Sequence, residues 1–136
     1  MIETHKDGTL PTKLISAKND IVFVFGSNLA GIHGAGAAKE AFDHWDAEWG
    51  IGVGLTGHAY AIPTKNKHIN SLSLKLITPH IKDFVIYSRI NDDKLFWLTR
   101  IGCGLAGYED YTIAPLFRGI ANNVNIPEQW HKYLIK

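Results

Sequence analysis

The sequence predicts a single α/β domain over residues 1–136, a three-layer sandwich with a mostly parallel or mixed sheet. Two observations predict this fold. Segments with the apolar pattern of strands alternate along the chain with segments of helical periodicity. The apolar run at residues 21–25 is rich in β-branched and aromatic residues and lacks polar alternation, which is typical of a strand covered on both faces. A chain of 136 residues suits one compact domain.

A glycine-rich loop and a helix follow this strand. Gly26 is expected to end the strand, and the next glycines punctuate a loop without charged side chains. A helix is expected from Ala35 to about residue 49, because apolar residues recur with helical spacing. Its predicted buried face consists of Ala38, Ala41, Phe42, Trp45 and Trp49.

The chemistry of this segment follows from the predicted geometry. A helix N-terminus presents unpaired backbone N–H groups and a partial positive charge. Glycines allow the main chain to approach a ligand closely. The segment therefore predicts a site for phosphate or another anion. The alternative is a tight strand-to-helix connection with no ligand.

The remaining elements alternate along the chain. Within the glycine-rich residues 50–57, Gly52, Gly54 and Gly57 match G-x-G-x-x-G. A helix precedes them and a strand follows, so we expect a surface crossover rather than a dinucleotide fingerprint. Thr78 and Pro79 are expected to open a helix as its cap and first residue. Thr112 is the expected cap of another helix. The expected ranges are strands at 12–17, 58–62, 95–101 and 122–126, and helices at 78–90, 113–119 and 127–134.

A second glycine loop repeats the first arrangement. Residues 102–107 also match G-x-G-x-x-G, and they lie between a predicted strand and a predicted helix. Too little chain follows to complete a dinucleotide-binding half, but backbone N–H groups at a helix start can still hold phosphate. Both loops leave strands at the carboxyl edge of the sheet. We therefore expect them to bind one ligand from two sides, most simply a diphosphate.

Composition and missing motifs exclude several classes of function. The net charge of +1, without a basic tract, argues against a nucleic-acid partner. Cys103 is the only cysteine, so no intramolecular disulfide can form. No secretory signal and no apolar run of membrane-spanning length is visible, so we expect a cytoplasmic protein without a membrane partner. Ile32 and His33 stand where a P-loop needs Lys and Ser or Thr. The scattered histidines indicate no metal site, and we expect no cofactor.

Four side chains in the two loops are candidates for chemistry, each with an alternative. Asn28 could position a ribose or a water, or it could form a turn with its own backbone. His33 could contact phosphate or act as a general base, or it could be an exposed loop residue. Cys103 could be a nucleophile, although a small buried cysteine is the favoured interpretation. Tyr108 could stack on a base or a ribose, or pack at the helix entrance.

The two loops also carry a family resemblance. The stretches GSNLAGIHGAGAAKEA and TRIGCGLAGYEDYTIAPLF resemble the two ligand loops of macrodomains. The blocks FGSNLAG, YAIPTK and IGCGLAG are similar to those of a group of uncharacterised macrodomain-like bacterial and phage proteins. These blocks lie within residues 25–107, so the resemblance covers most of the chain.

The resemblance implies a ligand and a role for several residues. Macrodomains typically bind ADP-ribose, and some hydrolyse it from proteins. Asn28 would match the Asn that contacts the distal ribose, with Tyr108 nearby. Asp20 is the candidate for reading adenine. Residues 34–36 and 102–107 would match the two diphosphate loops.

Three functions are therefore kept open. The first is binding of ADP-ribose or a related nucleotide diphosphate, free or on an ADP-ribosylated macromolecule. The second is hydrolysis of an ADP-ribosyl bond at the same site, with Asn28 or His33 orienting water. The third is a structural or partner-binding role without a small ligand. The predicted ligand contacts are Gly26, Ser27, Asn28, Leu29, Gly31, His33, Gly34, Ala35, Gly36, Gly102, Cys103, Gly104, Leu105, Ala106, Gly107 and Tyr108.

Overall fold

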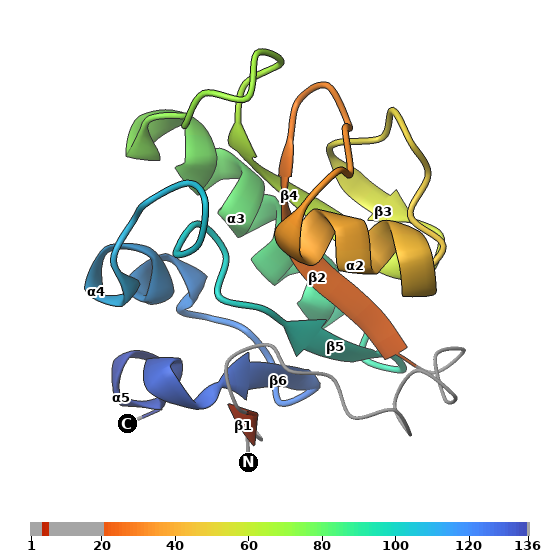
Figure 1. Cartoon of the computed structure of the whole chain (residues 1–136). Helices are drawn as coiled ribbons and strands as arrows, with labels where there is room; N and C mark the ends of the chain where they lie inside the picture. The colour runs from red at the N-terminus through yellow and green to blue at the C-terminus, as the bar shows by residue number, and fades with distance from the viewer. Residues whose placement is uncertain (1–3, 6–20, 136) are drawn as a thin grey trace.

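A computed structural model describes residues 4–5 and 21–135 of the chain (Figure 1). In this part, six strands form one sheet in the order β1-β6-β5-β2-β4-β3. Neighbouring strands are parallel except β3 and β4, which are antiparallel. The predicted α/β class with a mixed sheet is confirmed. The strand expected at 12–17 lies outside the described residues, as does Asp20.

The elements have the following bounds. The strands are β1 (Thr4–His5), β2 (Ile21–Asn28), β3 (Gly54–Thr56), β4 (Ala59–Lys65), β5 (Leu95–Leu98) and β6 (Val124–Pro127). The α-helices are α2 (Gly36–His44), α3 (Leu74–Ile90), α4 (Asp110–Ile113) and α5 (His131–Leu134). Two 3₁₀ turns are η2 (Ala114–Phe117) and η3 (Glu128–Trp130).

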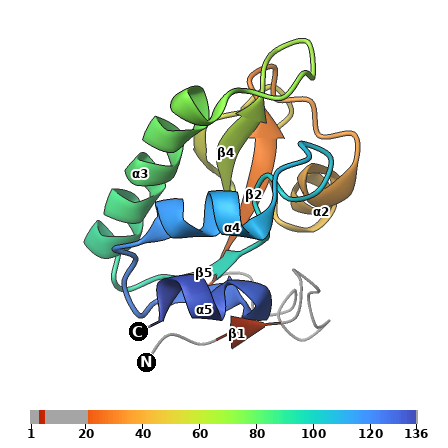
Figure 2. The same cartoon turned by 90° about the vertical axis from the view of Figure 1, so that its left-hand side faces the viewer.

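The central strand β2 is buried on both faces. Its residues alternate between two hydrophobic clusters, with Phe23 and Phe25 in one cluster and Val22 and Val24 in the other. The first cluster includes residues of α2, and the second includes residues of α3, α4 and η2. Figure 2 shows the sheet between α2 on one side and α3 on the other. Helices therefore cover both faces of the sheet, as in a three-layer sandwich.

The first helix is shorter than predicted. It ends at His44, and Trp45 is its fully buried C-cap residue. The chain turns away at Asp46, whose φ is +61°, so the helical spacing no longer applies beyond this point. Phe42 and Trp49 were predicted in the core but are 44% and 56% exposed.

Two strand ends and one helix start also differ from the prediction. The strand β2 continues past Gly26 to Asn28, because it pairs with β4 as far as Lys65. Pro63 does not end β4. The antiparallel neighbour β3 pairs only with residues 59–61 of β4, so no β3 residue is paired with Pro63, which has no N–H to donate. Helix α3 starts one turn before Thr78 and Pro79, so both lie inside it, and Thr78 Oγ1 donates to Leu74 O (2.6 Å).

The C-terminal elements are more broken than predicted. The helix expected at 113–119 is the short α4 followed by η2, so Thr112 lies inside α4 instead of capping it. The terminal helix expected from residue 127 is split into η3 and α5. The buried face predicted for α3 is confirmed, because Ile81, Phe84, Val85 and Ser88 are all buried.

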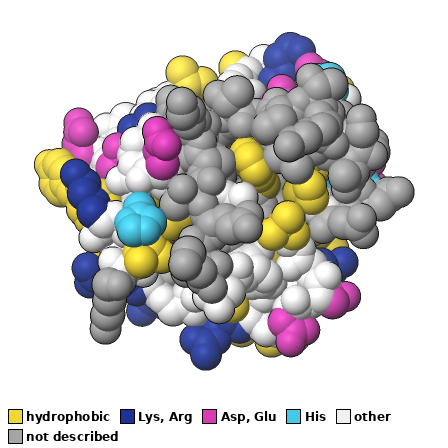
Figure 3. All heavy atoms as spheres, turned by 90° about the horizontal axis from the view of Figure 1, so that it is seen from below, with side chains coloured by type: hydrophobic (Ala, Val, Ile, Leu, Met, Phe, Trp, Pro, Cys, Tyr) yellow, Lys and Arg dark blue, Asp and Glu magenta, His cyan; other side chains and the backbone are white. Residues whose placement is uncertain are grey.

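Charge is mixed on the surface. Figure 3 shows basic and acidic side chains interspersed on one face of the molecule, consistent with the net charge of +1. No helix in the described part of the chain is both long and apolar enough to span a membrane.

The glycine-rich segment 50–57 packs back on the loop that follows β2. Gly50 N donates to Gly31 O (2.8 Å). A Cβ placed on Gly52 would lie 2.0 Å from Asn28 O, and a Cβ on Gly31 would lie 2.2 Å from the carbonyl carbon of Gly50. The glycines of this segment therefore permit a close approach of two main chains.

We expect Gly52→Ala to lower the free energy of unfolding by roughly 2 kcal/mol or more, because the new methyl group would overlap a backbone carbonyl. Urea unfolding measures this loss. The matched control is Gly104→Ala, where a Cβ would have no neighbour within 4 Å. A similar stability for both variants would contradict the close approach.

Candidate functional site

A cavity of about 820 Å³ opens at the carboxyl edge of β2, β4 and β5. The loop after β2 leads to α2 on one face of the sheet, whereas the loop after β5 leads to α4 on the other face. Adjacent parallel strands whose connections leave in opposite directions create a crevice, which is where α/β sheets bind ligands. The position of the cavity thus follows from the topology.

The structure brings the two predicted loops together in this cavity. The predicted contact residues that line it are Gly26, Ser27, Asn28, Gly34, Ala35, Gly36, Gly102, Cys103, Gly104, Leu105 and Ala106. The predicted contact residues that do not line it are Leu29, Gly31, His33, Gly107 and Tyr108.

The start of α2 forms one wall of the cavity. Its N-cap residue, Ala35, has no side chain that could accept from the helix start, and the first intrahelical bond runs from Lys39 N to Ala35 O (3.2 Å). The amides of residues 36–38 therefore have no intrahelical acceptor, and all three residues line the cavity. An uncapped helix start facing a cavity favours an anionic ligand.

The second glycine loop forms the opposite wall. It turns at Gly102 and Gly107, whose φ values are +77° and +85°. Ser71 Oγ donates to Ala106 O (2.8 Å) and attaches the loop to the segment before α3. On the other side, Leu105 Cδ1 lies 3.9 Å from the place of a Cβ on Gly36. The loop thus extends over the cavity toward α2.

Asn28 lies at the end of β2 and is 7% exposed. Its Nδ2 donates to Ile32 O (2.8 Å), and its Oδ1 accepts from Ile32 N (3.0 Å). The side chain therefore closes a turn with its own loop, which was the alternative to ligand contact. Asn28 also lines the cavity, so the same amide shapes the loop at the cavity wall.

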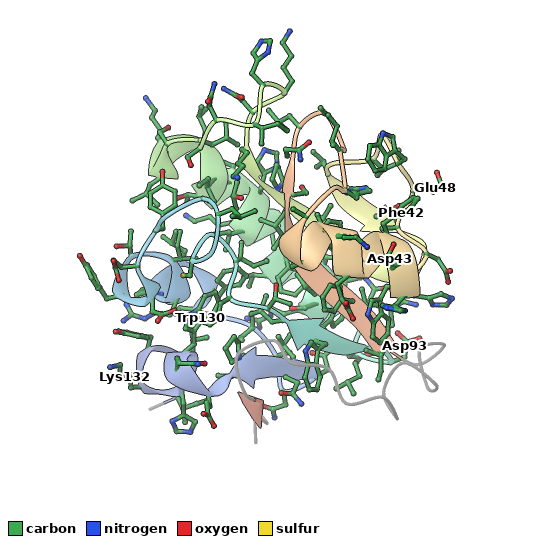
Figure 4. All side chains as sticks on the ribbon, viewed as in Figure 1. Phe42, Asp43, Glu48, Asp93, Trp130 and Lys132 are labelled. Atoms are coloured by element: carbon green, nitrogen blue, oxygen red, sulfur yellow. The ribbon has the colours of Figure 1, made fainter. Side chains whose placement is uncertain are left out.

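His33 lies outside the cavity, contrary to the expected contact. It is 1% exposed, and its Nε2 lies 2.7 Å from Glu48 O. Since a carbonyl only accepts, Nε2 carries the proton. The imidazole packs edge-on against Phe25 and Trp49 and also contacts the ring of Phe42. Figure 4 shows Phe42 and Glu48 close to each other. His33 therefore holds the first loop from behind, and this placement favours a structural role over general-base catalysis.

Three other predicted contacts have different surroundings. The hydroxyl of Tyr108 donates to Leu72 O, which places this ring in packing contacts outside the cavity. Gly31 adopts a φ of +70° and packs against Gly50. Leu29 is 44% exposed, and its N–H donates to Lys65 O (3.0 Å).

An ion-pair network behind the second loop was not predicted from the sequence. Arg100 lines the cavity, and its guanidinium donates to both carboxylate oxygens of Asp110 (3.0 and 2.7 Å). Trp130 Nε1 donates to Asp110 Oδ1 (2.7 Å), and Figure 4 shows Trp130 between α4 and α5. The sequence feature that could have indicated this ion pair is the presence of opposite charges, on Arg100 and Asp110, on either side of residues 102–107.

Further polar residues complete the cavity. Thr99 Oγ1 donates to Val24 O (2.7 Å) and Thr64 Oγ1 to Ser27 O (3.4 Å), so both hydroxyls donate to backbone carbonyl groups of β2. The half-buried side chains of Lys65 and Glu40 also line the cavity. Among residues 4–5 and 21–135, no group of three or more His, Cys, Asp or Glu residues could hold a metal ion.

No protein-family model, no curated protein and no solved structure matches this chain.

The hydrogen bonds from Arg100 and Trp130 change the acidity of Asp110. Burial on its own would raise the pKa of this carboxyl group, but hydrogen bonds from Arg100 and Trp130 outweigh it and lower the pKa. A lowered pKa in the folded state stabilises the fold above the pKa of the unfolded carboxyl group, about 4. This stabilisation is lost as the pH falls through the folded-state pKa.

We expect Asp110→Asn to lower the free energy of unfolding by roughly 1–3 kcal/mol at pH 7, because Arg100 would lose its bidentate partner. The difference from the unmodified chain should shrink as the pH is lowered below about 4, as followed by urea unfolding. The control Asp92→Asn replaces an exposed carboxylate and should change stability by less than about 0.5 kcal/mol. A loss for Asp110→Asn that stays constant with pH would contradict the lowered pKa.

Cys103 is held as a neutral thiol. Burial is the largest cause and the charge of the nearby Asp110 carboxylate is the second. They raise the pKa of the Cys103 thiol to about 12. Because only the thiolate attacks electrophiles, this environment disfavours a nucleophilic role.

Alkylation tests this conclusion directly. At pH 8.5, iodoacetamide should modify folded Cys103 about 10–100-fold more slowly than the unfolded chain, since the smaller thiolate fraction outweighs its greater nucleophilicity. Mass spectrometry follows the reaction, with protein in urea as the control. Equal alkylation rates for the folded and the unfolded chain would show that the fold does not suppress formation of the Cys103 thiolate.

Proposed function

We propose that this chain binds ADP-ribose or a related nucleotide diphosphate between the start of α2 and the loop at 102–107. The observation that carries the proposal is that an uncapped helix N-terminus and a second glycine loop face the same cavity. Its volume of about 820 Å³ falls within the range of small-molecule sites.

The diphosphate is the part of the ligand that this geometry explains best. The amides of residues 36–38 lie on one wall, and glycines allow the main chain on the opposite wall to approach phosphate oxygens. Lys65 and Arg100 add positive charge to the lining, Glu40 adds a negative charge, and Arg100 is partly neutralised by Asp110. A ligand with two adjacent phosphates would contact both walls at once.

The resemblance to macrodomains supports the same ligand. In this proposal, the sandwich is macrodomain-like, and the cavity matches the place where that family binds ADP-ribose. An ADP-ribosyl group on a macromolecule would present the same diphosphate to the cavity.

The geometry favours binding over hydrolysis. Of the two residues considered for orienting water, His33 does not line the cavity. The other, Asn28, uses both atoms of its amide on Ile32. We therefore propose a binding module, and hydrolysis of an ADP-ribosyl bond is not part of the proposal.

Calorimetric titration with ADP-ribose, with ADP and AMP as comparisons, tests the proposal. The informative variant is Gly34→Asp, because a Cβ at residue 34 meets only Ile32 Cγ2 at 4.0 Å. A carboxylate beside the start of α2 should leave the fold intact, since negative charge is favoured there. It should repel a diphosphate and weaken ADP-ribose binding at least about tenfold, or 1.4 kcal/mol.

Gly34→Asn is the matched control, with nearly the same shape and no charge, and should retain most of the affinity. Thermal unfolding gives an independent measure, because ligand at about 100 times its Kd stabilises the fold by roughly 2.7 kcal/mol. The proposal fails if the unmodified chain binds neither ADP-ribose nor ADP, or if both variants bind equally well.

A further inference from the structure

The outward face of helix α3 carries large apolar side chains along its whole length. The helix buries one face against the sheet and exposes the other, and Figure 2 shows it on the outside of the molecule. On the exposed face, Leu76, Ile86 and Ile90 are 56%, 56% and 74% exposed, and Pro79 is exposed as well. Their spacings of three, four and seven residues place them on one side of the helix. A surface helix normally presents polar residues to water, so this pattern indicates a partner on the outer face.

Three rows of exposed residues run along this face, each with a spacing of seven residues. The first row is Leu76, Asp83 and Ile90, the middle row is Pro79 and Ile86, and the basic row is Lys75, Lys82 and Arg89. Successive residues of an α-helix are about 100° apart, so Lys82 and Asp83 lie on opposite sides of the middle row.

The surroundings of the helix agree with this arrangement of the rows. In the basic row, Arg89 Nη1 donates to Gly119 O (3.0 Å), which follows η2. In the first row, Asp83 lies toward β4, because its carboxylate acts after burial to raise the pKa of Tyr60 to about 12. Among the residues that the structure describes, neither Lys82 nor Asp83 has an ion-pair partner. Both charges can therefore pair with a second molecule.

These charges fit a second copy of the chain in one orientation. Twofold symmetry with parallel α3 helices places the first row of each copy against the basic row of the other. Lys82 of each copy then meets Asp83 of the other, which gives two ion pairs. With antiparallel helices each row would meet itself, so Lys82 would face Lys82 and Asp83 would face Asp83, which is unfavourable.

The apolar residues and the area of the face fit the same pairing. In the parallel pair, the middle row packs against its own copy, and the alkyl stems of Lys75 and Arg89 can cover Leu76 and Ile90 of the second copy. The helix is about 25 Å long, and its three rows expose roughly 500 Å² per copy. Weak, reversible interfaces bury up to about 600 Å² on each partner. The face is therefore large enough for a dimer in equilibrium with the monomer.

We infer that this chain forms a twofold-symmetric dimer through the outer face of α3, with parallel helices and Lys82 of each copy paired with Asp83 of the other. An apolar face with a basic row could also lie on an anionic membrane. Asp83 argues against a membrane, because a carboxylate in line with Leu76 and Ile90 would meet acyl chains and negative headgroups. No residue of α3 lines the cavity, so the dimer is independent of the proposed ligand.

Sedimentation velocity from micromolar to millimolar protein tests the dimer, and the unmodified chain should pass from monomer to dimer over this range. Ile86→Glu should weaken dimerisation at least about tenfold, because it places a charge in the middle row. Glutamate has a high helix propensity, so the helix should be retained. Val53→Glu is the matched control, since Val53 is 50% exposed and lies outside α3, and it should leave the dissociation constant within about twofold.

Exchange of the two charges tests the orientation. In the parallel pair, Lys82→Asp brings two carboxylates together and Asp83→Lys brings two ammonium groups together, so each should weaken dimerisation about fivefold or more. The double variant restores opposite charges and should return to within about twofold of the unmodified chain. Melting temperatures within about 2 °C of that chain, and unchanged titration with ADP-ribose, report separately on the fold and on the proposed function.

The dimer is overturned if the unmodified chain stays monomeric at millimolar concentration, or if Ile86→Glu dimerises equally well. The parallel orientation is overturned if both single charge variants dimerise like the unmodified chain, or if the double variant does not recover. Vesicles of phosphatidylcholine with phosphatidylserine test the other occupant. A monomeric chain that binds these vesicles, and loses that binding in Ile86→Glu, would assign the face to a membrane and overturn the dimer.

Discussion

The burial of β2 on both faces is the constraint on which the rest of the structure depends. A strand with Phe23 and Phe25 on one face and Val22 and Val24 on the other requires helices on both sides of the sheet. The connections from β2 and β5 leave in opposite directions, toward α2 and α4. The crevice between them is a product of this packing, so the location of the candidate site follows from the core.

Two polar side chains outside the cavity hold the loops in place. His33 fixes the first loop through Glu48 O, and Asp110 fixes the second through Arg100. In both cases a side chain that carries polar atoms is directed at the protein rather than at a ligand. This arrangement leaves the main chain of each loop to face the cavity, which suits recognition of phosphate by backbone amides. Preorganised loops lose less conformational freedom when a ligand binds.

Much of the fold could be predicted from the sequence because its signals are local. The apolar run of β2, the two glycine loops and their common edge of the sheet are all visible in the residue pattern. The exposure of Trp49 was not predictable, because it depends on the positive φ at Asp46, which ends the helical register. The start of α3 was misplaced because Thr78 and Pro79 resemble a helix cap, although the helix begins one turn earlier.

The candidate site was predicted less completely than the fold. Its main-chain walls were found through their glycines, but the burial of His33 and the pairing of Arg100 with Asp110 depend on contacts between distant segments. A histidine within a glycine loop looks the same in sequence whether it faces a ligand or an aromatic cluster. Tertiary packing decides between the two, and a single sequence does not reveal it.

The exposed ring of Trp49 gives the molecule an internal optical signal. Of the four tryptophans in the chain, Trp45, Trp97 and Trp130 are at most 5% exposed, whereas Trp49 is 56% exposed and its ring packs against His33. Water-soluble quenchers will therefore reach Trp49 in preference to the other three. Because His33 belongs to the first glycine loop, a rearrangement of that loop would change the emission of Trp49 while the buried indoles stayed constant. The chain thus carries its own fluorophore behind one wall of the cavity, without any added label.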